Sequence, residues 1–449
     1  MDRVDRSPET GAAPSRQPRA WYIVGLLTAL AVLSFLDRYI LALLAAPLAK
    51  DLRLSDSQVA LVIGLAFAVV YAVGGIPIAQ LIDRYRRKPI LVVGVLLWSG
   101  LTIAAAFAQS FTTLLICRAG VALGEAVLAP AAISLIADLF PHGQRATPTS
   151  VFASVTSIMS KGAFLLGAGA LAIASMLDPY VRLANWRMAL IIVGVPGLFL
   201  AILVAFTMRE PARIAAPNET RDAGDFAPFV RYLSDNWRLY LPFYVGVMAF
   251  GVFAIAAVSW VPSLLVRGFA LEPATACLWI GVIGSISGFL GTFFWPWLAG
   301  RFVRAGKHGA IFIAMALAGA VLIFGAGLGY ANASLAVVLA GLAVAQFATS
   351  AGAAMPPLAI QAFGPPRMRA KLTSLNQIAI HLIGSSLGPL AVAWLALGWP
   401  GAPRALGYGL AALGVVTGMV GSLSLVWASR AARTLSQPGV AMTPAPQSI

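Results

Sequence analysis

Residues 114–128 read LLICRAGVALGEAVL, an apolar run that only Arg118 and Glu125 interrupt. A second long apolar run holds Asp37 and Arg38 side by side. A charge at the centre of a bilayer costs roughly 2.5 to 3.5 kcal/mol on insertion scales, so such side chains pair with one another or line a polar cavity. The two runs therefore predict membrane-spanning helices that share a charged layer on a solute or ion pathway.

The composition indicates that the rest of the chain also lies largely in a membrane. Of 449 residues, 60% are hydrophobic and 10% are charged, whereas a soluble domain carries about 25% charged residues. An α-helix rises 1.5 Å per residue, so about 20 apolar residues cross the bilayer core. Twelve runs meet this length and predict an all-α integral membrane protein: 21–46, 58–82, 89–108, 111–138, 147–175, 186–207, 239–266, 274–299, 309–330, 333–360, 370–397 and 404–429.

The positive charges predict how these spans are oriented. If the N-terminus is cytoplasmic, the inner segments hold 22 of the 31 Lys and Arg residues and the outer loops hold six. This bias is the positive-inside pattern, so we expect both termini in the cytoplasm and assign the net charge of +15 to topology rather than to a nucleic-acid partner. Residues 1–18 are polar and show no signal peptide.

A polar stretch at 208–238 divides the chain into two halves of six spans each. We expect bundles at 19–207 and 239–430, a cytoplasmic linker at 208–238, and disordered cytoplasmic tails at 1–18 and 431–449. A weak internal repeat supports this division, because Arg145, Ala146, Thr149 and Ser150 recur 224 residues later as Arg369, Ala370, Thr373 and Ser374. The Gly384 and Gly388 pair, followed by Pro389, predicts close helix contact in the eleventh span.

Three motifs resemble the major facilitator superfamily and, within it, the Spinster family. The loop Asp83-Arg84-Tyr85-Arg86-Arg87-Lys88 resembles the cytoplasmic signature of the superfamily, with Ala79 and Arg86 at its two usual glycine positions. The runs 35–39 (FLDRY) and 118–141, which ends in IADLFP, resemble bacterial Spinster proteins. The resemblance implies two six-helix bundles in a bacterial cytoplasmic membrane. It also implies that Asp83, Arg84, Arg87 and Lys88 form a conformational motif that stabilises an outward-open state.

The four intramembrane charges are predicted to lie in one layer. Asp37 lies about nine residues, or roughly 13 Å, below the outer end of the first span. Arg118 lies at a similar depth in the fourth span, and Glu125 is two helical turns further along the same face. Desolvation favours the protonated form of a carboxyl group and a nearby arginine favours its charged form. Asp37 and Glu125 are therefore the candidate protonation sites, with Arg38 and Arg118 as partners that either neutralise them or hold an anionic substrate.

Alternative roles remain for these four charges and for other polar residues within the spans. The four charges can also form static ion pairs that lock the bundle. Lys161, in the middle of the fifth span, suits either a substrate anion or a carboxylate such as Glu125. Asn376, Gln377 and His381 in the eleventh span are candidates for substrate binding, or for ordinary hydrogen bonds between helices.

The function predicted is a proton-coupled secondary transporter that moves an amphipathic or anionic solute by alternating access. The resemblance implies lysolipids or sphingoid phosphates, and small organic anions or drugs are the alternative. The two cysteines and three scattered histidines form no metal-binding cluster and no nucleophile paired with a base, so we do not expect an enzyme. The sequence also lacks a phosphate-binding loop, so we do not expect ATP to be the energy source. We expect no cofactor beyond the proton gradient, membrane lipids as surroundings, and a monomer. A non-transporting sensor is a remote alternative.

Overall fold

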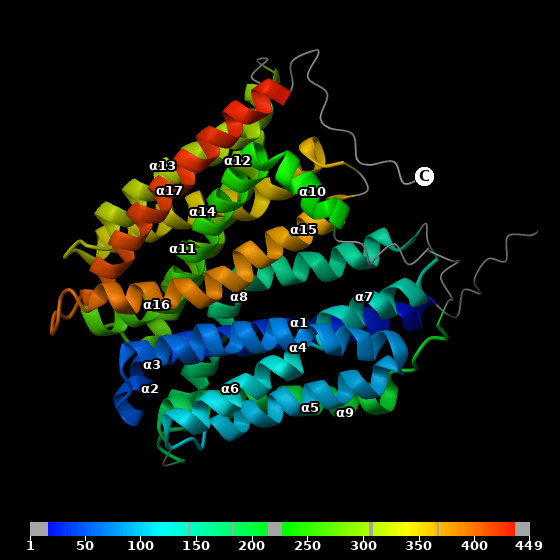
Figure 1. Ribbon diagram of the computed structural model, residues 1–449. Helices are drawn as coiled ribbons and strands as arrows, with labels where there is room; N and C mark the ends of the chain where they lie inside the picture. Colours follow the sequence, from blue (N-terminus) through cyan, green and yellow to red (C-terminus); the bar gives the residue numbers. More distant parts are fainter. Residues whose placement is uncertain are drawn as a thin grey trace, which may run out of the picture.

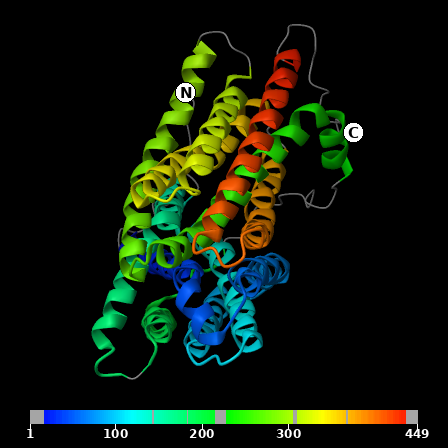
Figure 2. The same cartoon turned by 90° about the vertical axis from the view of Figure 1, so that its left-hand side faces the viewer.

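The computed structural model describes residues 17–141, 144–181, 183–213, 227–304, 309–365 and 368–435. Within these ranges the chain is helical and contains no strand. The helices form two groups, and Figures 1 and 2 show the blue and cyan helices of the first half mostly on one side of the molecule and the yellow to red helices of the second half on the other. Most of both predicted tails and residues 214–226 of the predicted linker lie outside the described residues, while the later part of the predicted linker is helical.

The first half contains ten helical segments. They are α1 (Gln17–Leu43), α2 (Ala45–Leu52), α3 (Asp56–Ala60), η1 (Leu61–Leu65), α4 (Ala66–Arg84), α5 (Arg87–Ala105), α6 (Phe111–Glu125), α7 (Leu128–Leu139), α8 (Ala146–Leu177) and α9 (Asn185–Thr207). The second half contains α10 (Ala227–Asp235), α11 (Trp237–Phe269), α12 (Pro273–Arg304), α13 (Ala310–Gly329), α14 (Leu335–Phe363), α15 (Arg369–Gln377), η5 (Ile378–Ile383), α16 (Gly384–Ala396) and α17 (Ala405–Leu435). The labels η1 and η5 mark π-helical segments.

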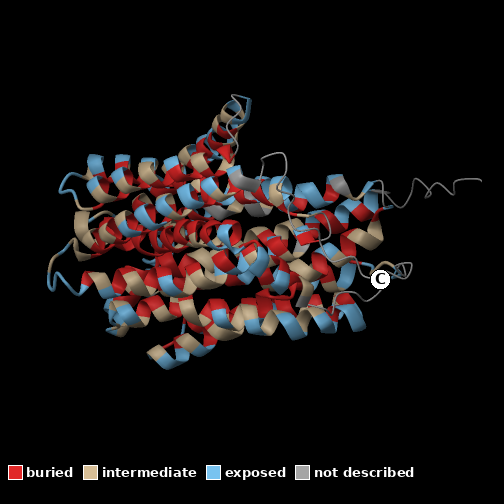
Figure 3. Ribbon diagram, turned by 45° about the horizontal axis from the view of Figure 1, so that its top comes forward, coloured by how far each residue is buried: buried red, intermediate tan, exposed pale blue. Residues whose placement is uncertain are grey.

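The predicted spans agree with these helices. Among the described residues, eleven helices are long and apolar enough to cross a membrane, and they occupy eleven of the twelve predicted spans. The fifth predicted span is α8, whose described apolar part runs from Gly162 to Leu177. Buried residues lie on the helix faces that turn toward neighbouring helices, and exposed residues lie on the outside (Figure 3). Large apolar side chains such as Phe206, Ile76 and Phe199 are exposed there, as expected of a surface that contacts lipid.

Small residues allow the helices of the second half to pack closely. A Cβ atom at Gly388 would lie 2.5 Å from the carbonyl oxygen of Val252, and one at Gly384 would lie 2.9 Å from that of Gly251. Both contacts join α16 to α11, so the close helix contact predicted for the eleventh span is confirmed.

The internal repeat is visible in the hydrogen bonds. Arg145 Nε donates to the carbonyl oxygen of Phe140 at 3.0 Å, and Arg369 Nε donates to that of Gly364 at 3.0 Å. Both carbonyls end a helix, α7 in one case and α14 in the other. The same arginine therefore caps the corresponding helix end in each half, 224 residues apart.

The two halves contact each other through several helix pairs, including α8 with α12 and α1 with α11. The basic face, named after the basic run 84–88, is the face at which α4 and α7 end and α5 and α8 begin. The far face is the opposite one, where α11 ends and α12 begins. At the far face α16 packs on η1 and α3, and α11 packs on α2. Arg267 Nη1 bonds Asp56 Oδ1 across the two halves there at 2.6 Å. At the basic face α15 packs on α14 of its own half instead.

Candidate functional site

The four intramembrane charges meet where α1 and α6 cross. Asp37, Arg118 and Glu125 are only 4%, 2% and 1% exposed. Arg38 Nη2 bonds Glu125 Oε2 at 2.9 Å, and Ser34 Oγ donates to the same oxygen at 2.9 Å. The Arg38 side chain is 27% exposed, whereas that of Glu125 is fully buried. The predicted layer thus contains one buried ion pair whose cation also reaches accessible space.

Asp37 has a different environment from the one predicted. Its Oδ2 accepts a hydrogen bond from Thr102 Oγ1 of α5 at 2.6 Å, and the described residues include no ion pair between its carboxylate and either arginine. Arg118 instead donates to backbone carbonyl oxygens, to Asp37 at 3.4 Å and to Arg38 at 2.9 Å. One carboxylate is therefore held by a cation and the other by a hydroxyl.

A small cavity lies beside the Asp37 carboxylate. It has a volume of about 10 Å³, which is about the room that one water molecule needs. Its polar walls are Asp37, Thr102 and Arg118, and its other walls are apolar side chains of α1, α5, α6 and α9. Asp37 therefore faces the interior of the first bundle, while Arg38 and Glu125 form the adjoining pair.

Glycines and a proline place these groups. A Cβ at Gly124 would lie 2.7 Å from the carbonyl oxygen of Gly94, so α5 and α6 approach closely at this point. Pro130 lacks an N–H and its ring crowds the carbonyl of residue 126, which interrupts the helix. The fourth span is accordingly broken into α6 and α7, and Glu125 is the last residue of α6. Transporter sites commonly lie at such breaks.

The candidates in the second half lie on α15 and on η5, and η5 packs on α4 of the first half. Asn376 is buried, and its Oδ1 has no hydrogen-bond partner among the described residues. Gln377 and His381 are exposed, and His381 is close enough to Arg38 for their charges to interact. The π-helical segment η5 lies between Gln377 and Gly384, so Gln377 and His381 are not held at the spacing of a regular α-helix. Lys161 lies in α8, but its side chain is outside the described residues.

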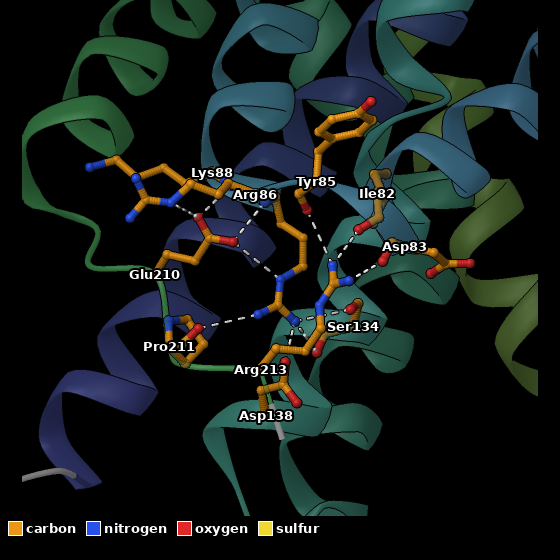
Figure 4. A network of polar contacts seen from close by, with 11 residues as sticks. Ile82, Asp83, Tyr85, Arg86, Lys88, Ser134, Asp138, Glu210, Pro211 and Arg213 are labelled. Atoms are coloured by element: carbon orange, nitrogen blue, oxygen red, sulfur yellow. Dashed lines mark hydrogen bonds and ion pairs between the residues drawn. The ribbon is translucent and has the colours of Figure 1, made fainter. Parts of the chain in front are cut away.

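A second polar cluster lies at the basic face, around the predicted conformational motif (Figure 4). Arg87 is buried, and its guanidinium bonds Asp138 Oδ2, Ser134 Oγ at 3.0 Å and the carbonyl oxygen of Pro211 at 3.2 Å. Glu210 accepts from the backbone N–H of Arg87 at 2.6 Å and from that of Lys88 at 3.4 Å. The segment after α9 thus caps the beginning of α5.

The end of α4 is closed by the same segment. Arg213 donates to the carbonyl oxygens of Ile82 at 2.6 Å, of Tyr85 at 3.2 Å and of Asp83 (Figure 4). The side chains of Asp83 and Arg84 are exposed, and neither makes an ion pair among the described residues. Within the motif, Arg87 is the member that is held by carboxylates.

Several residues of both clusters could not be recognised as site residues from the sequence. Ser34 and Thr102 are neutral and lie within apolar spans, where a search for charges passes over them. Glu210 and Arg213 follow the sixth span and resemble ordinary loop charges. For Glu210 the sequence did contain a signal of a structural role, because this residue directly precedes Pro211 at the end of a span.

The sequence and the fold match known transporters. The model of the Major Facilitator Superfamily matches residues 27–389. The chain belongs to the major facilitator superfamily. It is 27% identical over 398 residues to an MFS-type efflux pump of Mycolicibacterium smegmatis, covering 88% of this chain and 89% of that one. It is also 27% identical over 446 residues to a 4-hydroxybenzoate transporter of Pseudomonas putida, covering 89% of this chain and 92% of that one.

A solved structure extends this match to the Spinster family. A bacterial homologue of the human lysosomal transporter Spinster, in an inward-facing and unoccupied conformation, superposes with a TM-score of 0.78. The two chains are 25% identical, and the match covers 94% of this chain and 98% of that one. The resemblance inferred from residues 35–39 and 118–141 is thereby confirmed, as is the fold of twelve helices in two bundles.

Proposed function

We propose that this integral membrane protein is a proton-coupled secondary transporter that moves an amphipathic anion by alternating access. The observation that carries the proposal is the pairing within the charged layer. Glu125 is bonded to Arg38, which is partly exposed, while Asp37 is buried against Thr102. Two carboxylates with such different partners suit separate protonation steps.

The chemistry of coupling follows from the charges. With both carboxylates ionised, Asp37 and Glu125 balance Arg38 and Arg118. A proton on Glu125 removes the charge that holds Arg38, and the freed guanidinium can then bind a carboxylate or phosphate in bidentate geometry. Protonation and anion binding thus favour each other at this pair.

The class of substrate is supported by the surroundings of Arg38. Its guanidinium lies 4.9 to 5.5 Å from the ring centroids of Phe67, Tyr71 and Phe35. These aromatic side chains, with the exposed His381 nearby, suit a solute with a charged group and an apolar body. The 4-hydroxybenzoate transporter is named for an aromatic carboxylate, and the Spinster resemblance implies lysolipids or sphingoid phosphates. Each of these solutes carries an anionic group on an apolar body.

The orientation completes the proposal. Lys and Arg residues gather in the loops of the basic face, so we place that face and both termini in the cytoplasm of a bacterial cell. The halves are joined at the far face by the Asp56 and Arg267 ion pair. The arrangement is therefore an inward-open state, and transport requires the two bundles to rock until the far face opens.

The test is transport by the purified protein in liposomes that contain a pH-sensitive dye. Lysolipids, sphingoid phosphates and aromatic carboxylates are added one at a time, with a neutral sugar as the control solute. The proposal expects proton movement with at least one anion and none with the sugar. Anion uptake that leaves the internal pH unchanged would contradict proton coupling.

A further inference from the structure

Phe67 lies between the two arginines of the charged layer. Its ring centroid is 4.4 Å from Arg118 Cζ and 4.9 Å from Arg38 Cζ, and the side chain is only 6% exposed. The Nε atoms of Arg38 and Arg118 have no hydrogen-bond partner among the described residues. The face of an aromatic ring attracts a guanidinium group electrostatically, so one aromatic side chain here stabilises two like charges.

The segment that carries Phe67 is tied to the second bundle. Phe67 lies in the first turn of α4, directly after η1. Gly64 of η1 faces α16 so closely that a Cβ would lie 2.5 Å from the carbonyl oxygen of Ser385 and 3.0 Å from Pro389 Cγ. A π-helical turn holds an extra residue, and such turns occur frequently at functional sites. Separation of the bundles at the far face removes this support from η1.

We propose that Phe67 is a positioning residue that fixes the placement of Arg38 and Arg118 and makes it depend on the contact between η1 and α16. This inference deepens the proposed function and rests on it for its role in transport. In the inward-open state, α16 holds η1, and Phe67 holds both guanidinium groups. When the far face opens, η1 is released, Phe67 moves, and both arginines change position together.

The placement itself can be measured without any substrate. In protein labelled with ¹⁵N-arginine, the Nε–H signals of Arg38 and Arg118 are assigned with the Arg38→Lys and Arg118→Lys variants. A proton over an aromatic ring is shifted by the ring current, so Phe67→Leu is expected to move both signals, while Phe67→Tyr keeps them near their original positions. Phe140→Leu, at a buried phenylalanine outside the layer, is the matched control. Unchanged signals in Phe67→Leu, or equal shifts in Phe140→Leu, would overturn the inference.

The dependence on the far face has its own pair of variants. Gly64→Ala places a methyl group against α16, whereas a Cβ at Gly75 meets nothing within 4 Å. Gly64→Ala is expected to move both arginine signals and Gly75→Ala to leave them in place. The link between bundles is refuted if the two variants give the same spectrum.

Binding of dodecyl phosphate supplies the functional readout. Phe67→Leu is expected to weaken its affinity about tenfold, which corresponds to about 1.4 kcal/mol, and Phe67→Tyr to stay within about threefold of the wild type. Unchanged affinity in Phe67→Leu would contradict the role in binding. If the wild type does not bind this anion, the proposed substrate class fails, and the arginine signals still decide the positioning of the side chains.

Discussion

At the residue scale, the site is defined by how two buried carboxylates are partnered. Glu125 has a guanidinium and a hydroxyl on one oxygen, while its Oε1 has no hydrogen-bond partner among the described residues. Asp37 has the hydroxyl of Thr102. A buried ion pair is costly to break from one side, because the remaining charge stays in a dry environment. The Arg38 and Glu125 pair should therefore behave as a unit.

This coupling predicts a double-mutant result. Arg38→Gln should lower the free energy of unfolding by about 3 to 5 kcal/mol, because it leaves Glu125 charged and unpaired. Adding Glu125→Gln should restore most of the loss, since no buried charge then remains. Thermal unfolding in detergent measures both changes. Arg86→Gln, which removes a side chain that is 86% exposed and lies 3.9 Å from Glu210 Oε2, is the control and should cost at most about 1 kcal/mol. A double mutant as unstable as Arg38→Gln would show that the pair does not act as a unit.

The sequence predicted the charged residues of this site but not how they are partnered. Asp37, Arg38, Arg118 and Glu125 stand out because charges are rare in apolar spans. Which carboxylate takes which arginine depends on the rotation and spacing of α1, α5 and α6, which the close approach of Gly94 and Gly124 helps to set. Thr102 and Phe67 were missed because neutral residues in such spans are ordinary.

At the element scale, the basic face is organised by helix ends. The last carbonyls of α4 and the first N–H groups of α5 have no partners within their helices. Arg213 bonds the former and Glu210 the latter, each with the charge that suits the helix dipole. One short segment after α9 therefore holds the turn between α4 and α5.

Removal of the Glu210 carboxylate should loosen the beginning of α5. In Glu210→Ala, the amide hydrogens of Arg87 and Lys88 should exchange about tenfold faster, because a lost cap costs about 1 kcal/mol or more. Hydrogen exchange followed by mass spectrometry of the peptide that covers these residues measures the change. Arg209→Ala, at an exposed neighbour, should leave the exchange rate unchanged. Equal protection in wild type and Glu210→Ala would argue against the capping role.

Breaks within helices were harder to predict than the helices themselves. The length of the apolar runs predicted the spans, and the structure has helices in all of them. The break after Glu125 has a sequence cause in Pro130. The π-helical segments η1 and η5 have none, because LVIGL and IAIHLI are ordinary apolar sequences. Both lie where glycines allow tight contact, Gly64 with α16 and Gly251 with Ile380 of η5.

At the scale of the whole molecule, the bundles meet at the far face and along α8 and α12, and the proposed inward-open state requires them to be apart at the basic face. The Asp56 and Arg267 ion pair and the packing of α16 on η1 make this junction. The sequence predicts two similar halves but not which face is open, since alternating states of a transporter differ little in energy and both belong to one sequence.

A covalent link across the far face should trap this state. Asp56→Cys and Arg267→Cys, in a background in which Cys117 and Cys277 are replaced by alanine, are joined with a short bifunctional thiol reagent. Cross-linking should abolish transport, because the far face must open in every cycle. The pair Asp51→Cys and Arg187→Cys lies within the first bundle and is the control, in which transport should persist. Full activity with the 56–267 link in place would exclude opening at the far face.

The most direct test of the central claim is substrate-dependent proton flux in liposomes for the wild type, Asp37→Asn and Glu125→Gln. An amphipathic anion should drive proton movement in the wild type, and each amide variant should lower this flux at least about tenfold while remaining folded. Proton-coupled uptake at wild-type rates in both variants would contradict the assignment of Asp37 and Glu125 as the protonation sites.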